Sequence, residues 1–83
     1  MVAESDVITL QMECTLFFEN NPYALETSTG MSKRLGRNAN LIERALNRLT
    51  ELSILEKNGQ GTRAIYRYKT PYIQTEVDMN AYD

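Results

Sequence analysis

The stretch from residue 39 to residue 69 limits what this chain can fold into more than any other part of the sequence. It begins with apolar residues at three- and four-residue spacing: Ile42, Ala45, Leu46, Leu49 and Leu52. This spacing predicts an amphipathic helix over residues 39–52. Strand-like residues 54–57 and 62–69 then flank Asn58-Gly59-Gln60-Gly61, and Asn-Gly between two such runs is a strong hairpin signal. A helix that leads directly into a β-hairpin leaves few small folds available.

A first helix is predicted over residues 6–19. Its main apolar side is formed by Val7, Leu10, Cys14, Phe17 and Phe18, which recur at helical spacing. The helix ends before Pro22, because proline cannot continue a helix. A second apolar stripe of Ile8, Met12 and Leu16 lies on a different side. This stripe is either packed inside the domain or a contact with a second copy of the chain.

Two short elements are predicted between these helices. Residues 23–26 alternate apolar and other side chains and are interpreted as a very short strand. Thr27 or Ser28 offers an N-cap for a short second helix, which ends at Gly36, where a helix C-terminus favours a residue tolerant of positive φ. Asn38 is the expected N-cap of the following helix. The predicted fold class is therefore α+β, mainly helical, with a three-helix core and a small C-terminal β-hairpin.

Length and composition exclude several classes of protein. A chain of 83 residues is expected to form one domain, here over residues 1–70, followed by an acidic tail over residues 71–83. The chain has no histidine and one cysteine, which excludes an internal disulfide and a His/Cys zinc site and removes the commonest general base. We therefore expect neither an enzyme nor a cofactor, and no small-molecule ligand can be inferred.

Neither a membrane span nor a signal peptide is expected. The longest uninterrupted apolar stretch is three residues, Leu16-Phe17-Phe18, whereas a spanning helix needs about 18 or more. The N-terminal residues include Glu4 and Asp6 rather than a basic segment before an apolar one. The expected location is the cytoplasm.

The net charge of −2 hides a strong asymmetry along the chain. Residues 1–32 contain five acidic and no basic side chains, and residues 70–83 contain three acidic and no basic ones. All nine lysines and arginines lie in residues 33–69, against three glutamates, which gives this segment a charge of +6. Such a concentration favours a polyanionic partner.

The predicted element order points to a known arrangement. Two helices joined by a tight turn form a helix-turn-helix, and a hairpin directly after it forms a wing. Residues 24–69 resemble the winged helix-turn-helix transcription regulators of bacteria and archaea. The residues that carry the resemblance are Met31-Ser32-Lys33-Arg34-Leu35-Gly36-Arg37-Asn38 for the second helix and turn, Ile42, Ala45, Leu46, Leu49, Leu52 and Ile54-Leu55-Glu56 for the third helix and first wing strand, and Ile65-Tyr66-Arg67-Tyr68 for the returning strand. Ser53 stands where this family commonly has glycine.

The expected partner is double-stranded DNA, with helix 39–52 in the major groove and wing 54–69 on the backbone. Arginine can read guanine and asparagine can read adenine in the major groove, and a basic wing strand suits phosphate contacts. The predicted DNA-binding residues are Arg37, Asn38, Asn40, Arg44, Asn47, Arg48, Lys57, Arg63, Arg67 and Lys69. About six neutralised phosphates would give a slope near −5 for log affinity against log salt.

An alternative function is a winged helix that contacts another protein in a larger assembly. The acidic segments 1–32 and 70–83 and the expected exposure of Leu41 favour this alternative. The possible homodimer would form through the stripe of Ile8, Met12 and Leu16.

Overall fold

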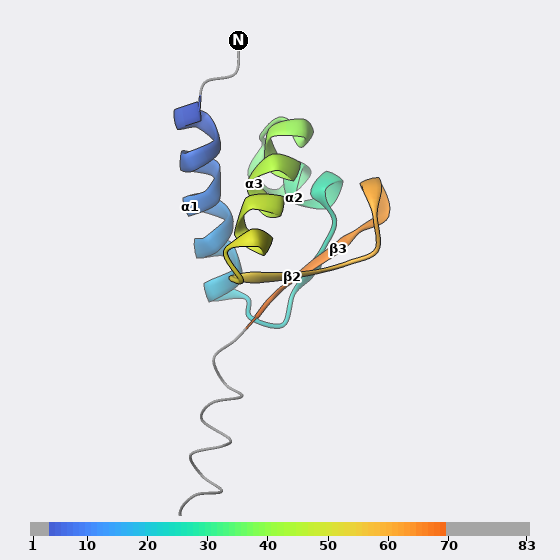
Figure 1. Ribbon diagram of the computed structural model, residues 1–83. Helices are drawn as coiled ribbons and strands as arrows, with labels where there is room; N and C mark the ends of the chain where they lie inside the picture. The colour runs from blue at the N-terminus through green and yellow to red at the C-terminus, as the bar shows by residue number, and fades with distance from the viewer. Residues whose placement is uncertain (1–3, 70–83) are drawn as a thin grey trace, which may run out of the picture.

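The computed structural model describes residues 4–69, and the predicted acidic tail over 71–83 lies outside them. The helices are α1 (Glu4–Asn20), α2 (Ser28–Leu35) and α3 (Ala39–Glu51), and the strands are β1 (Leu25–Glu26), β2 (Leu55–Asn58) and β3 (Ile65–Tyr68). Figure 1 shows α1 and α3 side by side, with α2 behind α3 and the hairpin beside it. The predicted α+β class is confirmed at this level, because the described chain is mostly helical with a small antiparallel sheet.

The helix boundaries follow from capping residues that the sequence predicted. The Thr27 side chain caps α2, and α2 ends at Gly36, whose φ of 67° is left-handed. The Asn38 Oδ1 accepts hydrogen bonds from the backbone N–H groups of Asn40 and Leu41 at 2.9 and 3.1 Å. These bonds satisfy two of the donors that a helix N-terminus leaves free. Caps at these positions hold α2 and α3 at a fixed angle across a connection of only three residues.

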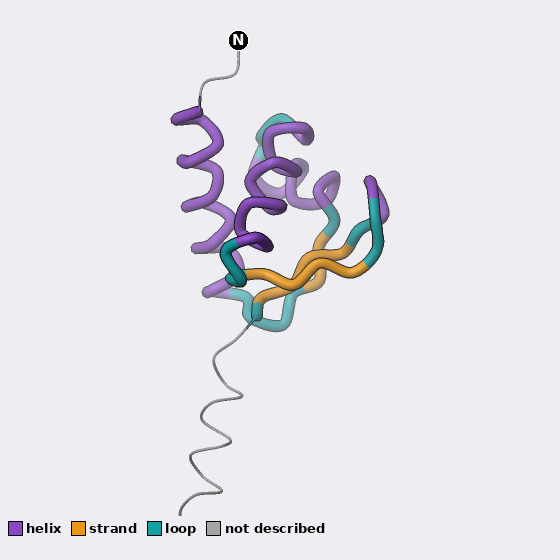
Figure 2. Tube along the Cα trace, viewed as in Figure 1, coloured by secondary structure: helices purple, strands orange, loops and turns teal. Residues whose placement is uncertain are grey.

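The core lies between the three helices and the inner face of the sheet, whose arrangement is shown in Figure 2. Its largest fully buried side chains are Tyr66, Phe18, Met31, Ile42, Leu46, Leu49, Leu55 and Cys14. The prediction that Cys14 is a core residue is confirmed. The stripe of Ile8, Met12 and Leu16 is not packed inside the domain, because these side chains are 52%, 63% and 57% exposed.

The predicted hairpin is present, but its loop is longer than expected. The three strands form an antiparallel sheet in the order β1-β3-β2. Asn58 pairs with Ile65, so Asn58 belongs to the strand and not to the predicted turn over residues 58–61. Gly59 and Gly61 both have positive φ, and a 3-10 turn over Gly61–Arg63 follows. The predicted returning strand over 62–69 is therefore only residues 65–68, and Arg63 lies in the loop.

The link between α3 and β2 is strained at one residue. α3 ends one residue earlier than predicted, with Leu52 as its C-cap. Ser53 then takes a φ of 64° and is the only described non-glycine residue in the left-handed region. This conformation costs a residue with a Cβ atom roughly 1–2 kcal/mol. Glycine, which the resemblance leads us to expect here, would avoid this cost.

Candidate nucleic-acid interface

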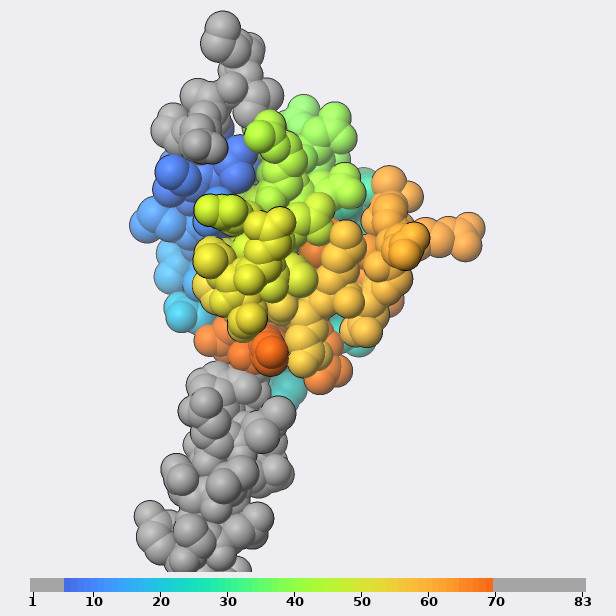
Figure 3. Space-filling view, in the orientation of Figure 1, coloured from blue at the N-terminus to red at the C-terminus, as the bar shows by residue number. Residues whose placement is uncertain are grey.

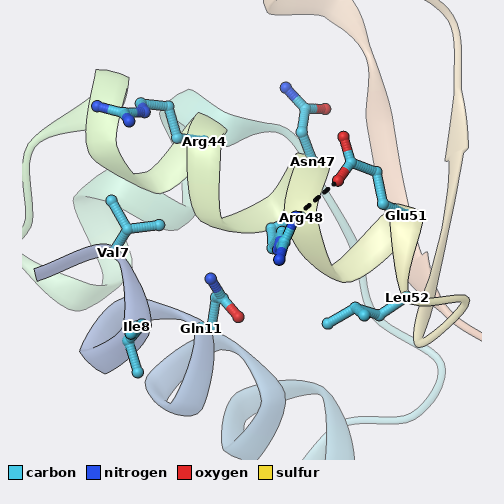
Figure 4. A pocket seen from close by; sticks show the side chains of 8 residues that line it. All are labelled: Val7, Ile8, Gln11, Arg44, Asn47, Arg48, Glu51 and Leu52. Carbon is cyan, nitrogen blue, oxygen red and sulfur yellow. Dashed lines mark hydrogen bonds and ion pairs between the residues drawn. The ribbon is translucent and has the colours of Figure 1, made fainter. Parts of the chain in front are cut away.

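One face of α3 lies open between α1 and the hairpin (Figure 3). Asn40 and Arg44 are exposed on this face, and Figure 4 shows Arg44 extending along α3 toward its N-terminal end. Within residues 4–69 neither side chain has a hydrogen-bond or ion-pair partner. Both side chains are therefore accessible to solvent.

Asn47, predicted to read bases, instead joins α3 to the hairpin. Its Oδ1 accepts hydrogen bonds from the Tyr66 hydroxyl at 2.8 Å and from the Lys57 ammonium at 3.0 Å. The Lys57 nitrogen also lies 5.7 Å from the centre of the Tyr66 ring, within reach of a cation–π interaction. Reading adenine needs a free amide oxygen, and this oxygen already has two donors. We therefore assign Asn47 a structural role.

The expected basic face of the wing does not form. Lys57 pairs with Tyr66 in the sheet, so its side chain is on the inner face that meets α3, not on the outer face with Arg67. On that outer face Arg67 pairs with Glu56, both in sheet register and through an ion pair of 3.1 Å. Arg63 lies in the loop, and Lys69 follows the end of β3. The prediction of one basic wing face is wrong, because strand register separates Lys57 from Arg67, Arg63 lies in the loop and Arg67 is paired with Glu56.

Four arginines form ion pairs with the chain's own carboxylates: Arg34–Glu26 at 2.7 Å, Arg37–Glu13 at 2.7 Å, Arg48–Glu51 at 3.3 Å and Arg67–Glu56 at 3.1 Å. Hydrogen bonding to Glu13 raises the pKa of Arg37 and fixes its side chain against α1. By contrast, both partners of the Arg48 pair are more than half exposed, and such pairs contribute only about 0–1 kcal/mol. Arg48 is therefore available to another partner, while Arg37 is held by α1.

The basic side chains with neither an ion pair nor a side-chain hydrogen bond in the described part of the chain are Lys33, Arg44, Arg63 and Lys69. They come from α2, α3, the hairpin loop and the end of the hairpin. Lys33 was not among the predicted DNA-binding residues. It can be recognised only from the packing of the helices, because α2 lies directly behind α3 (Figure 1).

A metal-binding cluster and a reactive Cys14 thiol would be two groups that could carry chemistry in the described residues. No group of three histidine, cysteine or acidic side chains within residues 4–69 could hold a metal ion. Burial, with a smaller effect of Glu13, raises the pKa of the Cys14 thiol to about 12, which leaves it protonated and unreactive at neutral pH. No helix in the same range is both long and apolar enough to cross a membrane.

A cleft separates α1 from the outer face of α3. Its volume is about 550 Å³, and residues from both helices line it, among them Ile8, Gln11, Arg48 and Leu52 (Figure 4). It continues into an apolar groove of about 330 Å³ that is shared by α1, the end of α3 and Ile54. The α1 side of this groove is formed by the stripe predicted from the sequence, whereas Leu52, predicted to lie on the apolar side of helix 39–52, is 53% exposed.

Comparison of the chain with protein-family models, with curated proteins and with solved structures found no significant match in any of the three. Its function must therefore be inferred from the exposed side chains of α3, of the hairpin and of α1.

Proposed function

We propose that this protein is a winged helix-turn-helix DNA-binding protein that acts as a small transcription regulator. The order of elements supports this assignment, because α2 and α3 are joined by three residues and followed directly by the β2–β3 hairpin. Two helices joined in this way form a helix-turn-helix, whose second helix enters the major groove. The hairpin projects beside the exposed face of α3 (Figure 3), as a wing on the DNA backbone requires.

The observation that carries the proposal is the pair of unpartnered side chains on α3. Asn40 and Arg44 are four residues apart and therefore adjacent on one face of the helix. Both lie in its N-terminal half, which is the part of a recognition helix that contacts bases. Their amide and guanidinium groups match adenine and guanine in the major groove. Since no other described side chain occupies these groups, they are free to make base contacts.

Phosphate contacts are fewer than the sequence suggested. With Arg44 on a base, the unpaired cations left for the backbone are Lys33, Arg63 and Lys69. Three neutralised phosphates give a slope of about −3 for log affinity against log salt, in place of the value near −5 expected from six. The internal ion pairs account for this difference, because a paired arginine does not displace counterions unless its pair is first broken.

A protein-interaction module is the second candidate function. The exposed Ile8, Met12 and Leu16 favour it, because an apolar row of this kind is typical of a contact surface. The expected exposure of Leu41 is wrong, since Leu41 is half-buried and packs against the core. The exposed face of α3 that carries Asn40 and Arg44 is therefore polar, and the exposed apolar row lies on α1.

A matched pair of variants tests DNA binding by α3. Arg44→Gln and Arg34→Gln each remove one positive charge, but Arg34 of α2 is already paired with Glu26 of β1. Affinity is measured by fluorescence anisotropy, on a duplex selected from a random library and on mixed-sequence duplex, over a salt series. We expect Arg44→Gln to lose about 10- to 100-fold on the selected duplex, in line with the ~1–3 kcal/mol of a bidentate contact.

Arg34→Gln should stay close to the wild type on both duplexes. Equal loss from the two variants, or an affinity that does not change with salt, would contradict the proposal. A loss at Arg44 that is the same on selected and mixed DNA would reduce its role to a phosphate contact.

A further inference from the structure

α1 carries a row of apolar side chains that no other part of the described chain covers. Ile8, Met12 and Leu16 are each more than half exposed, and their four-residue spacing aligns them along one side of the helix. The apolar groove beside them extends this surface toward Leu52, which is also more than half exposed. These neighbouring side chains form one apolar surface, which we call the α1 face.

The charges around the α1 face have a simple arrangement. Glu13 lies on another side of α1, where it binds Arg37. The apolar row itself is uncharged as far as Glu19, which is exposed one turn beyond Leu16. At the opposite end of the row, Arg44, Arg48 and Glu51 line the same cleft as Ile8. The α1 face thus has a negative charge at one end, and two positive charges with one negative charge at the other.

We propose that the α1 face binds a second copy of this chain, with the two α1 helices antiparallel and crossing at Met12. A twofold interface must be self-complementary, and this surface meets that condition. With Met12 at the axis, Ile8 lies opposite Leu16 of the partner subunit, because both residues are four positions from Met12. Glu19 of the partner subunit then lies near Arg48.

Charge also decides between the two possible directions of the helices. A parallel pair would bring two Glu19 carboxylates together, and like charges at close range repel. The antiparallel pair joins opposite charges and also opposes the two helix dipoles. Arg48 can take part because its pair with Glu51 is exposed and long, at 3.3 Å.

The size of the α1 face sets the strength of the dimer. The row from Ile8 to Leu16 is only about 12 Å long at 1.5 Å per residue. Stable interfaces commonly bury about 800 Å² on each partner, and this surface is smaller. We therefore expect a dimer with a dissociation constant in the micromolar range.

Sedimentation velocity of the full chain between about 1 and 500 μM tests the proposal. The wild type should shift from monomer to dimer over this range, whereas Met12→Lys should remain monomeric at every concentration. Gln60→Lys, which adds the same charge in the exposed hairpin loop, is the matched control and should dimerise like the wild type. Circular dichroism of both variants verifies that the fold is retained.

Charge exchange tests the antiparallel register. Glu19→Arg and Arg48→Glu should each weaken the dimer several-fold, and the double variant should recover most of the loss because the pair is restored with reversed polarity. A monomeric wild type at 500 μM, a dimer that Met12→Lys leaves intact, or a double variant no better than the single ones would overturn the proposal. None of these results depends on DNA binding.

Discussion

Replacing Asn47 by alanine should destabilise the protein by about 2 kcal/mol. Asn47 Oδ1 is the acceptor for Tyr66, which is 1% exposed, and for Lys57. Without the Asn47 amide, the buried Tyr66 hydroxyl has no hydrogen-bond partner, and an unpaired buried donor costs about 1–3 kcal/mol. Lys57 loses less because it is only half-buried and water can replace the amide. The higher helix propensity of alanine offsets about 0.5 kcal/mol.

Urea and thermal denaturation measure this effect, and Asn40→Ala is the matched control. Asn40 is on the same helix and is exposed, and its side chain has no hydrogen bond within the described residues, so its replacement should change stability by less than about 0.5 kcal/mol. A loss of 2 kcal/mol lowers the melting temperature of a domain of this size by roughly 10 °C. Equal stability of the two variants would refute the structural role of Asn47.

A double-mutant cycle isolates the contact itself. Tyr66→Phe in the wild type removes a satisfied hydroxyl and should cost about 1 kcal/mol. In the Asn47→Ala background the same change removes an unpaired hydroxyl, and it should be neutral or stabilising. A coupling free energy of about 1 kcal/mol or more is therefore expected. Additive effects would mean that the hydroxyl and the amide do not depend on each other.

Two further predictions concern the left-handed residues, and one concerns the buried thiol. Gly36→Ala should lower the unfolding free energy by about 1–2 kcal/mol, and Ser53→Gly should raise it by up to about 1 kcal/mol, because both residues have φ near 65°. Urea titration measures the unfolding free energy of both variants, and changes of the same sign would contradict the reasoning. The raised pKa of Cys14 means that the unfolded thiol ionises first, so stability should be constant below about pH 8.5 and fall as the pH rises toward 12. Between pH 8 and 10.5 the wild type should lose about 2 kcal/mol more than Cys14→Ala, and parallel pH profiles would contradict this.

Most of the fold could be predicted because local signals agree with the tertiary structure. Thr27, Gly36 and Asn38 mark helix ends through contacts within a few residues, and such contacts are visible in the sequence. The apolar spacing of α3 likewise identifies its buried side. The hairpin loop was predicted less well, because the Asn58-Gly59 pair is also compatible with a strand end and a longer turn.

The candidate site was harder to predict, because whether a charged side chain is free to bind a partner depends on the residues that lie near it in the folded chain. Arg37 and Glu13 are 24 positions apart, yet they form one of the shortest ion pairs of the described chain. Nothing in the local pattern around either residue indicates this contact. It arises because α1 packs along α3 and therefore passes beside the turn that precedes α3. The surplus of bases in residues 33–69 thus overstated the number of cations free to bind phosphate.

The position of Lys57, in contrast, could have been derived from the sequence. Residues two apart on a strand share a face, and Leu55, an apolar residue at the start of the strand, is two positions before Lys57. If Leu55 faces the core, so does the stem of Lys57, and Glu56 faces outward with Arg67. The structure has this arrangement, with Leu55 2% exposed and Lys57 against Asn47. In a short strand, the position of one apolar residue therefore indicates which charged side chains face the core and which face outward. The number of charges in the strand does not indicate this.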